Sequence, residues 1–335
     1  METLYITKKD WDSFIKGKAE IISIFAPFEY EKKLFYKKVA PDIDIIYNRV
    51  RTVEPLKLFF TPFKERVVPE VYQIPEIVIM GVTACDINGL KILDKIFMEG
   101  DYRDPNYTNR REKVLIIGSD CLSPYPTCFC ELIGTHPYPE DVFDLNISFL
   151  EEGLLVDIGS DKGCSFIGGD QKFFQATKEQ INKREQNRKK TVEIIKESNR
   201  DFYFEGVKEK FKGAYQTELW RRPKDIENCV QCGSCTNNCP SCVCFLLEDT
   251  GTQEEDRKVK VWDSCLFPGY ARMAAGDSPR PTLQDRYANR LLCKYWYMVE
   301  NYGITGCTGC GRCIVGCAGK IDKRKVITEV LRERQ

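Results

Sequence analysis

The sequence predicts an α/β amino-terminal domain with parallel strands, followed by an all-helical carboxyl-terminal domain. Two short apolar runs, Glu76–Gly81 (EIVIMG) and Val114–Gly118 (VLIIG), have the length and composition of buried strands. The segment between them carries apolar residues on one helical stripe: Ile87, Leu90, Leu93 and Phe97. Near the carboxyl end, a helical pattern (LQDRYANRLLCKYWYMVE) lies between two dense groups of cysteines.

The order strand, helix, strand predicts a βαβ unit, whose two strands pair in parallel. The runs 142–150 (VFDLNISFL) and 153–159 (GLLVDIG) are predicted as further strands, and the segment EEG forms the turn between them. We therefore expect residues 1–167 to form the α/β domain.

A highly charged segment follows the α/β domain, and its central part contains no proline or glycine. This composition predicts a solvated helix that links the two domains. Its basic residues Arg184, Arg188, Lys189 and Lys190 are interpreted as an exposed face. We expect residues 168–222 to be this charged helical linker and residues 223–335 to be the carboxyl-terminal domain, which ends in a short amphipathic helix.

The composition excludes several classes of protein. Fifty basic residues balance fifty acidic ones, so no long-range field for nucleic acid or acidic lipid is expected. The first twenty residues lack the apolar region of a signal peptide, and no apolar run is long enough to cross a bilayer. These features predict a cytoplasmic protein that binds neither nucleic acid nor membrane.

The composition is unusual in its cysteine content. The chain has 17 cysteines but only one histidine. In a reducing compartment, so many thiols indicate metal binding rather than disulfides. His136, in GTHPYP, is interpreted as an ordinary loop residue.

Two cysteine runs share one spacing. CVQCGSCTNNCP and CTGCGRCIVGCA both follow C-x2-C-x2-C-x3-C, and Ala318 stands in the second run where Pro240 stands in the first. In bacterial ferredoxins the first three cysteines of such a run bind one [4Fe–4S] cluster and the fourth binds the other cluster. We assign Cys229, Cys232, Cys235 and Cys317 to cluster 1. We assign Cys307, Cys310, Cys313 and Cys239 to cluster 2.

Structural zinc is the alternative interpretation of these runs. Zinc is usually held by two separated C-x2–4-C knuckles, which this spacing matches poorly. Because a long segment with helical patterns separates the two runs, we expect an all-helical dicluster ferredoxin domain rather than the compact ferredoxin with its short connection.

A third group of cysteines follows the predicted parallel strands: Cys85, Cys121, Cys128 and Cys130. Loops at the carboxyl ends of adjacent parallel strands meet in one crevice, so these thiols are predicted to converge on a third [4Fe–4S] cluster. The alternative is that they are buried free cysteines.

The remaining cysteines are harder to assign. Cys242, Cys244, Cys265 and Cys293 could hold a further metal centre or pack beside the cubes, and we favour the structural role. Cys164 is predicted to be an inert core thiol. No dinucleotide-binding, P-loop or nucleophile-elbow motif occurs, and no acid–base constellation stands out, so no catalytic residue is predicted.

The ordered motifs GVTACDINGLKILDKIF, TCFC, CVQCGSCTNNCPSCVCF, VWDSC and CTGCGRC resemble the 4Fe–4S dicluster family over about residues 20–325. That family includes the beta subunit of sulfhydrogenase (soluble NiFe hydrogenase) and the corresponding subunit of anaerobic sulfite reductase. The family pattern matches at the eight ferredoxin cysteines, at the four of the third group, and at Cys242, Cys244 and Cys265. Ala318 departs from the pattern, which puts the shape of that turn in doubt.

The resemblance implies an electron-transfer subunit of an anaerobic oxidoreductase complex. It would relay single electrons between a partner subunit that binds FAD and NAD(P)H and a catalytic subunit of the NiFe hydrogenase or sirohaem sulfite reductase type. A heterodisulfide-reductase-linked complex is a further alternative. A redox-sensing scaffold, in which metal only stabilises the fold, is the alternative from another class.

Overall fold

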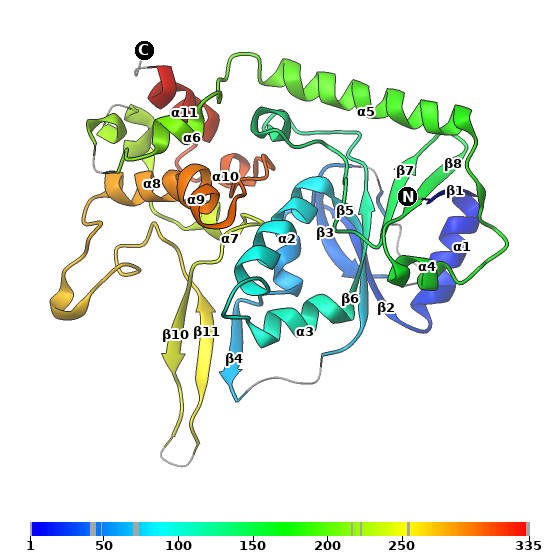
Figure 1. Ribbon diagram of the computed structural model, residues 1–335, viewed down its shortest axis with the longest axis horizontal. Helices are drawn as coiled ribbons and strands as arrows, with labels where there is room; N and C mark the ends of the chain where they lie inside the picture. The colour runs from blue at the N-terminus through cyan, green and yellow to red at the C-terminus, as the bar shows by residue number, and fades with distance from the viewer. Residues whose placement is uncertain are drawn as a thin grey trace.

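The computed structural model describes residues 2–40, 45–47, 49–69, 74–215, 217–221, 223–252 and 255–332. Its amino-terminal part is built on an eight-stranded sheet in the order β3-β2-β5-β6-β7-β8-β1-β9 (Figure 1). The strands are β1 (Glu2–Thr7), β2 (Ser23–Tyr30), β3 (Lys33–Lys38), β5 (Ile77–Thr83), β6 (Val114–Ser119), β7 (Leu145–Phe149), β8 (Gly153–Ile158) and β9 (Phe174–Gln175).

The centre of this sheet is parallel. Strands β2, β5, β6 and β7 pair in parallel, and the other neighbours pair antiparallel. The predicted strands 76–81 and 114–118 are therefore confirmed as β5 and β6, and their parallel pairing is confirmed too. The two strands predicted after them are confirmed as β7 and β8, which form an antiparallel pair.

Helices cover both faces of the sheet because its central strands are apolar on both sides. On one face, apolar residues of α1 (Lys8–Ala19) and α4 (Asp161–Ile167) share a core with Val78 and Met80 of β5. On the other face, α2 (Ala84–Phe97) and α3 (Pro105–Lys113) pack against Ile79 and Val82. All four residues of the stripe predicted between the first two strands are buried in this second core.

The charged segment forms α5 (Lys178–Ser198), a long helix that runs from the sheet toward the carboxyl-terminal helices (Figure 1). The interpretation of its basic residues as one exposed face is wrong for two of them. Arg184 donates two hydrogen bonds to Asp157, at 2.9 and 3.0 Å, and Arg188 donates two to Asp120, at 2.8 and 3.1 Å. These charge-assisted hydrogen bonds fasten the helix to the sheet.

The carboxyl-terminal part has a core of its own, to which helices far apart in sequence contribute. The helices are α6 (Val207–Phe211), α7 (Ser234–Asn237), α8 (Leu283–Leu292), α9 (Met298–Tyr302), α10 (Arg312–Val315) and α11 (Lys323–Arg332). A π-helical stretch, Cys293–Tyr297, joins α8 to α9, so the helix predicted there is continuous but changes its winding. The predicted last helix is α11, and residues 333–335 lie outside the described residues.

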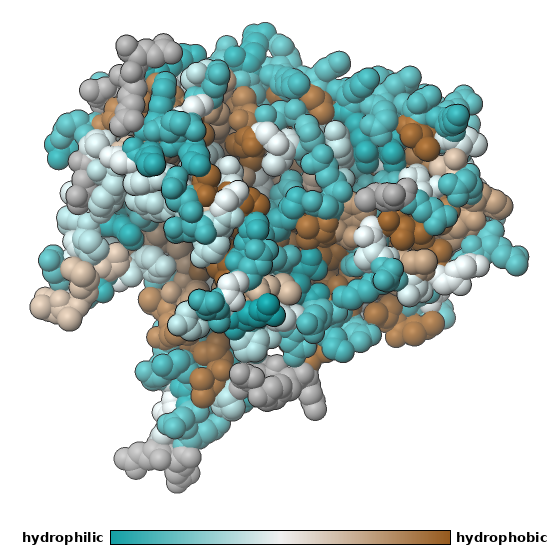
Figure 2. All heavy atoms as spheres, viewed as in Figure 1, coloured by the Kyte–Doolittle hydropathy of each residue, from teal (hydrophilic) through white to brown (hydrophobic). Residues whose placement is uncertain are grey.

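The expectation that this part is all-helical is not confirmed. Strands β10 (Phe245–Asp249) and β11 (Lys258–Trp262) form a hairpin, and β11 also pairs with β4 (Lys64–Val68) from the amino-terminal part. The hairpin projects from the body, and hydrophobic side chains gather at its base (Figures 1 and 2). This small sheet joins the two parts of the chain.

In the part of the chain that the structure describes, no helix is both long enough and apolar enough to span a membrane.

Candidate metal centres

The two ferredoxin runs fold into loops with the same backbone conformation. In the first loop, Gln231 and Gly233 have φ of 55° and 72°. Gly309 and Gly311 stand at the matching positions of the second loop, with φ of 63° and 70°. Each loop leads into a one-turn helix, α7 or α10. Left-handed residues between turns aim backbone N–H groups into one concavity, which is typical of anion and iron–sulfur sites.

Four thiols from both loops line one cavity: Cys239, Cys307, Cys310 and Cys313. This is the set that the sequence assigns to cluster 2, including the exchange of the fourth cysteine between the loops. Burial raises the pKa of Cys313 to about 12, so thiols here need nearby positive charge to ionise. The cavity supplies it, since Arg290, Lys294 and Lys323 are part of the lining.

The thiols assigned to cluster 1 lie nearer the surface. The thiol of Cys229 interacts electrostatically with those of Cys235 and Cys317, and Cys232 is exposed. The Cys317 Sγ accepts hydrogen bonds from the Ile321 amide and the Lys323 ammonium, both at 3.4 Å. Although partial burial opposes it, these two bonds hold the pKa of Cys317 below its ordinary value.

The third predicted group also comes together. Its four cysteines line one cavity with Cys310 of the second loop: Cys85, Cys121, Cys128 and Cys130. Cys85 opens α2 directly after β5, and Cys121 follows β6, because the carboxyl ends of these parallel strands share one edge of the sheet. Cys130 begins the 3₁₀ turn Cys130–Ile133.

The buried side chain of Arg51 tests whether the third group suits an anionic cluster. Its guanidinium lines the same cavity, and among the described residues its Nε and Nη2 atoms have no hydrogen-bond partner. Buried charges are normally paired. A cluster on four thiolates would supply the missing negative charge, so the residues present fit this group.

The second and third groups are in direct contact. The Phe129 amide donates a hydrogen bond of 2.8 Å to the Gly309 carbonyl. A Cβ atom on Gly309 would clash with the Cys130 Cα, so only glycine allows the two loops to approach this closely. Cys310 lines the cavities of both groups.

Buried basic residues are the functional side chains that the sequence interpretation missed. Arg286, Arg290 and Lys294 recur at four-residue spacing on one helical face, and all are buried. That spacing of cations beside the apolar residues of the same helix is the pattern that could have revealed them.

Cys242, Cys244, Cys265 and Cys293 lie beside the second group, and their arrangement is considered below. The prediction for Cys164 is wrong, because this thiol is exposed on α4 rather than buried in the core. His136 lies in a loop as predicted, with its Nδ1 atom 3.0 Å from the Glu131 carboxylate.

Among the described residues, no group of three or more Cys, His, Asp or Glu side chains is close enough to share a single metal ion. The thiolates around a cube stand farther apart than those around one zinc ion, because the cube itself lies between them. The zinc interpretation therefore gains no support from this geometry.

Two comparisons place the chain among known proteins. Residues 228–321 match the 4Fe-4S dicluster domain family. Over 326 residues the chain is 32% identical to the sulfhydrogenase 2 subunit beta of Pyrococcus furiosus, and the match covers 95% of each chain. The chain therefore belongs to the 4Fe–4S dicluster family of sulfhydrogenase beta subunits.

Proposed function

We propose that the chain is the electron-relay subunit of a hydrogenase-type complex. It passes single electrons between a partner subunit that binds FAD and NAD(P)H and a NiFe catalytic subunit. Three [4Fe–4S] clusters serve this relay, and they are held by the two ferredoxin sets and by Cys85, Cys121, Cys128 and Cys130. The cytoplasmic location expected from the sequence stays a prediction.

The observation that carries the proposal is the contact between neighbouring cysteine groups. Cys310 lines two cavities, and Lys323 approaches the thiols of the first and second groups. Cubes at these positions would each take up and release one electron at a time. The three groups of cysteines lie next to one another, which supports a relay through them.

The residues around the sites set the conditions for that chemistry. Buried apolar side chains such as Phe129 and Leu291 line the second cavity and exclude water. Backbone and ammonium N–H groups reach the thiol of Cys317. Such hydrogen bonds and buried cations are the means by which proteins tune the potential of a cluster.

The relative named a sulfhydrogenase subunit favours the hydrogenase alternative over sulfite reductase and heterodisulfide reductase complexes. The clusters of an electron-relay subunit must be reduced and reoxidised reversibly. A scaffold that uses metal only to stabilise its fold has no such requirement. Reversible reduction is therefore the property to measure.

The test is anaerobic purification followed by iron and sulfide analysis and a reductive titration monitored by EPR. We expect at least about 12 iron atoms per chain, four for each cube, and signals that appear and disappear reversibly. Cys130→Ala should remove about four iron atoms. Cys164→Ser, which changes an exposed thiol outside the three groups, is the matched control. Bound zinc with iron near zero, or clusters that cannot be cycled, would overturn the proposal.

A further inference from the structure

Beside the second group lies a further set of four cysteines that the relay does not use: Cys242, Cys244, Cys265 and Cys293. The thiols of Cys244 and Cys265 share a hydrogen bond, and the Cys242 thiol interacts with that of Cys265. Cys293 interacts with Cys244 from the π-helical stretch. The four residues come from three separate segments of the chain, so only the tertiary fold brings them together.

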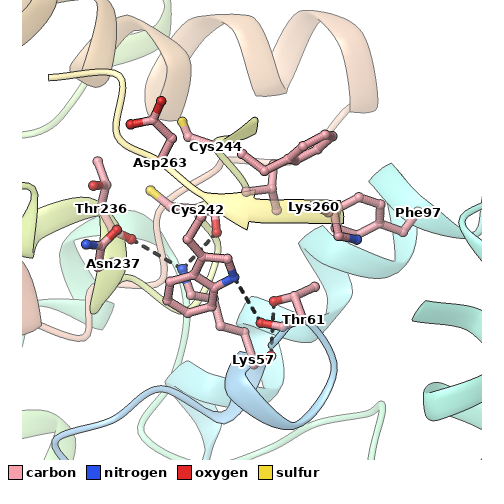
Figure 3. A pocket seen from close by; sticks show the side chains of 12 residues that line it. Lys57, Thr61, Phe97, Thr236, Asn237, Cys242, Cys244, Lys260 and Asp263 are labelled. Carbon is pink, nitrogen blue, oxygen red and sulfur yellow. Dashed lines mark hydrogen bonds between the residues drawn. The ribbon is translucent and has the colours of Figure 1, made fainter. Parts of the chain in front are cut away.

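Two of these thiols line one pocket. Figure 3 shows the sulfur atoms of Cys242 and Cys244 at the end of this pocket away from Lys260 and Phe97. The Lys57 ammonium donates a hydrogen bond of 2.9 Å to the Cys242 carbonyl.

Three buried cations surround the set. Lys57, Arg290 and Lys294 are 2%, 5% and 3% exposed, and none of them forms a salt bridge with a carboxylate among the described residues. The Arg290 Nε atom is buried without a hydrogen-bond partner in this part of the chain. The Lys294 ammonium donates to the Ser241 hydroxyl at 2.8 Å, a neutral partner. An unpaired buried charge is costly, and three together require negative charge nearby.

A cluster bound to these thiols would supply that negative charge. Cys242 and Cys244 line one cavity with Lys57, and Cys239 of the second group lines another with Arg290 and Lys294. Cys293 interacts electrostatically with Arg290 and Lys294. These two cations therefore approach both the second group and the further set.

The helix that carries Cys293 is also unusual at this point. The chain leaves α-helical winding at Cys293 and returns to it after Tyr297. Such π-helical turns are rare overall, and many of those that occur lie at functional sites. Here the altered winding occurs where the helix presents both Cys293 and Lys294 to the cysteine set.

From this convergence of four thiols and three buried cations, we infer that Cys242, Cys244, Cys265 and Cys293 bind a fourth [4Fe–4S] cluster. The inference goes beyond the proposed relay, which needs three. It makes the second site a neighbour of all the others, because Cys239 of that site interacts with Cys242. It differs from the structural role that we favour for these cysteines on the sequence alone.

The test counts iron and acid-labile sulfide in the full chain after anaerobic reconstitution, with Mössbauer spectra to separate the cubes. We expect about 16 iron atoms per chain, compared with about 12 if only the three relay sites are filled. Cys265→Ala and Cys293→Ala should each lower the count by about four, and the EPR signals of the other cubes should persist. Cys164→Ser should leave the count unchanged.

Cys265→Ala and Cys293→Ala alter different segments of the chain. If one variant fails to fold, the iron count of the other still tests the inference. A wild-type count near 12 would overturn the inference while leaving the relay intact. Full counts in both variants would overturn it too, as would one zinc ion at this place or a Cys244–Cys265 disulfide found by mass spectrometry. A count near zero would instead overturn the proposed function itself.

Discussion

The two ferredoxin loops have one backbone conformation but different surroundings. The first half of the loop Cys307–Cys317 lies beneath the cysteine loop of the α/β part, and Cys310 is 8% exposed. The first half of the loop Cys229–Cys239 faces outward, where Cys232 is exposed and Val230 is 64% exposed. Identical spacing therefore produces one interior site and one site near the surface.

This difference shows that the repeated motif determines the backbone conformation of the loop, whereas the residues between the cysteines determine what the loop contacts. Arg312 and Ser234 occupy the same position in the two loops. Arg312 donates hydrogen bonds to Asp86, at 2.7 and 2.9 Å, and to the carbonyl of Thr52. Ser234 accepts one hydrogen bond from Asn238 of its own loop, at 3.1 Å.

The largest expected effect comes from breaking the Arg312–Asp86 pair. Both side chains are almost fully buried, so Arg312→Ala leaves Asp86 as an unpaired charge and should cost about 3–5 kcal/mol of unfolding free energy. Ser234→Ala, at the matching position, should cost about 1 kcal/mol. Anaerobic denaturant unfolding of both variants measures the difference. The double variant Asp86→Leu/Arg312→Met should recover part of the loss, and equal effects at positions 312 and 234 would contradict the comparison.

The second prediction compares matching glycines. At Gly311 a new Cβ would clash with the Thr127 carbonyl oxygen, whereas at Gly233 it would meet the Phe267 ring at 2.7 Å. Both glycines have positive φ, so alanine is strained in either place. Because a ring can shift and backbone cannot, Gly311→Ala should cost about 2–4 kcal/mol and Gly233→Ala about 1–2 kcal/mol. Thermal unfolding under anaerobic conditions tests the order, which a larger loss for Gly233→Ala would reverse.

Local patterns were sufficient to predict much of this molecule. The βαβ unit around Ile87 and Leu90 follows from apolar runs and helical spacing, and both are local properties of the chain. The convergence of Cys85 and Cys121 follows from a general rule about parallel strands, and the cavity that they line agrees with it.

What the sequence did not reveal depends on partners distant in the chain. The strand at Lys258–Trp262 pairs with Lys64–Val68, and no local pattern specifies that pairing. Arg188 lies in a charged segment that is typical of a solvated helix face. Its partner Asp120 is 68 residues away in the chain, so local sequence does not reveal the pair. Lys57 similarly becomes a buried cation only through its contacts with the segment around Cys242.

The third prediction concerns access from solvent. The first loop is exposed at Val230 and Cys232, so a small polar oxidant such as ferricyanide should destroy the cube at this loop before the others. Rapid-freeze EPR after mixing follows each signal separately. The signal that Cys229→Ala removes identifies the first site, and Cys313→Ala identifies the second. Simultaneous loss of both signals would mean that burial does not distinguish the two loops.

The smallest expected effect concerns Lys323, whose ammonium lies 3.4 Å from the Cys317 Sγ atom. In Lys323→Met this charged donor is lost while a side chain of similar length still fills the space, so reduction of the first cube becomes less favourable. One such hydrogen bond is worth about 1 kcal/mol, or roughly 40 mV for one electron, and the potential should fall by that amount. Lys325→Met on the same helix is the matched control, because Lys325 is exposed and paired with Asp225. An EPR-monitored titration should show the first signal moving in Lys323→Met alone. If the signal of the second site moves instead, Lys323 acts mainly on Cys313, and the interior loop rather than the outer one depends on this cation.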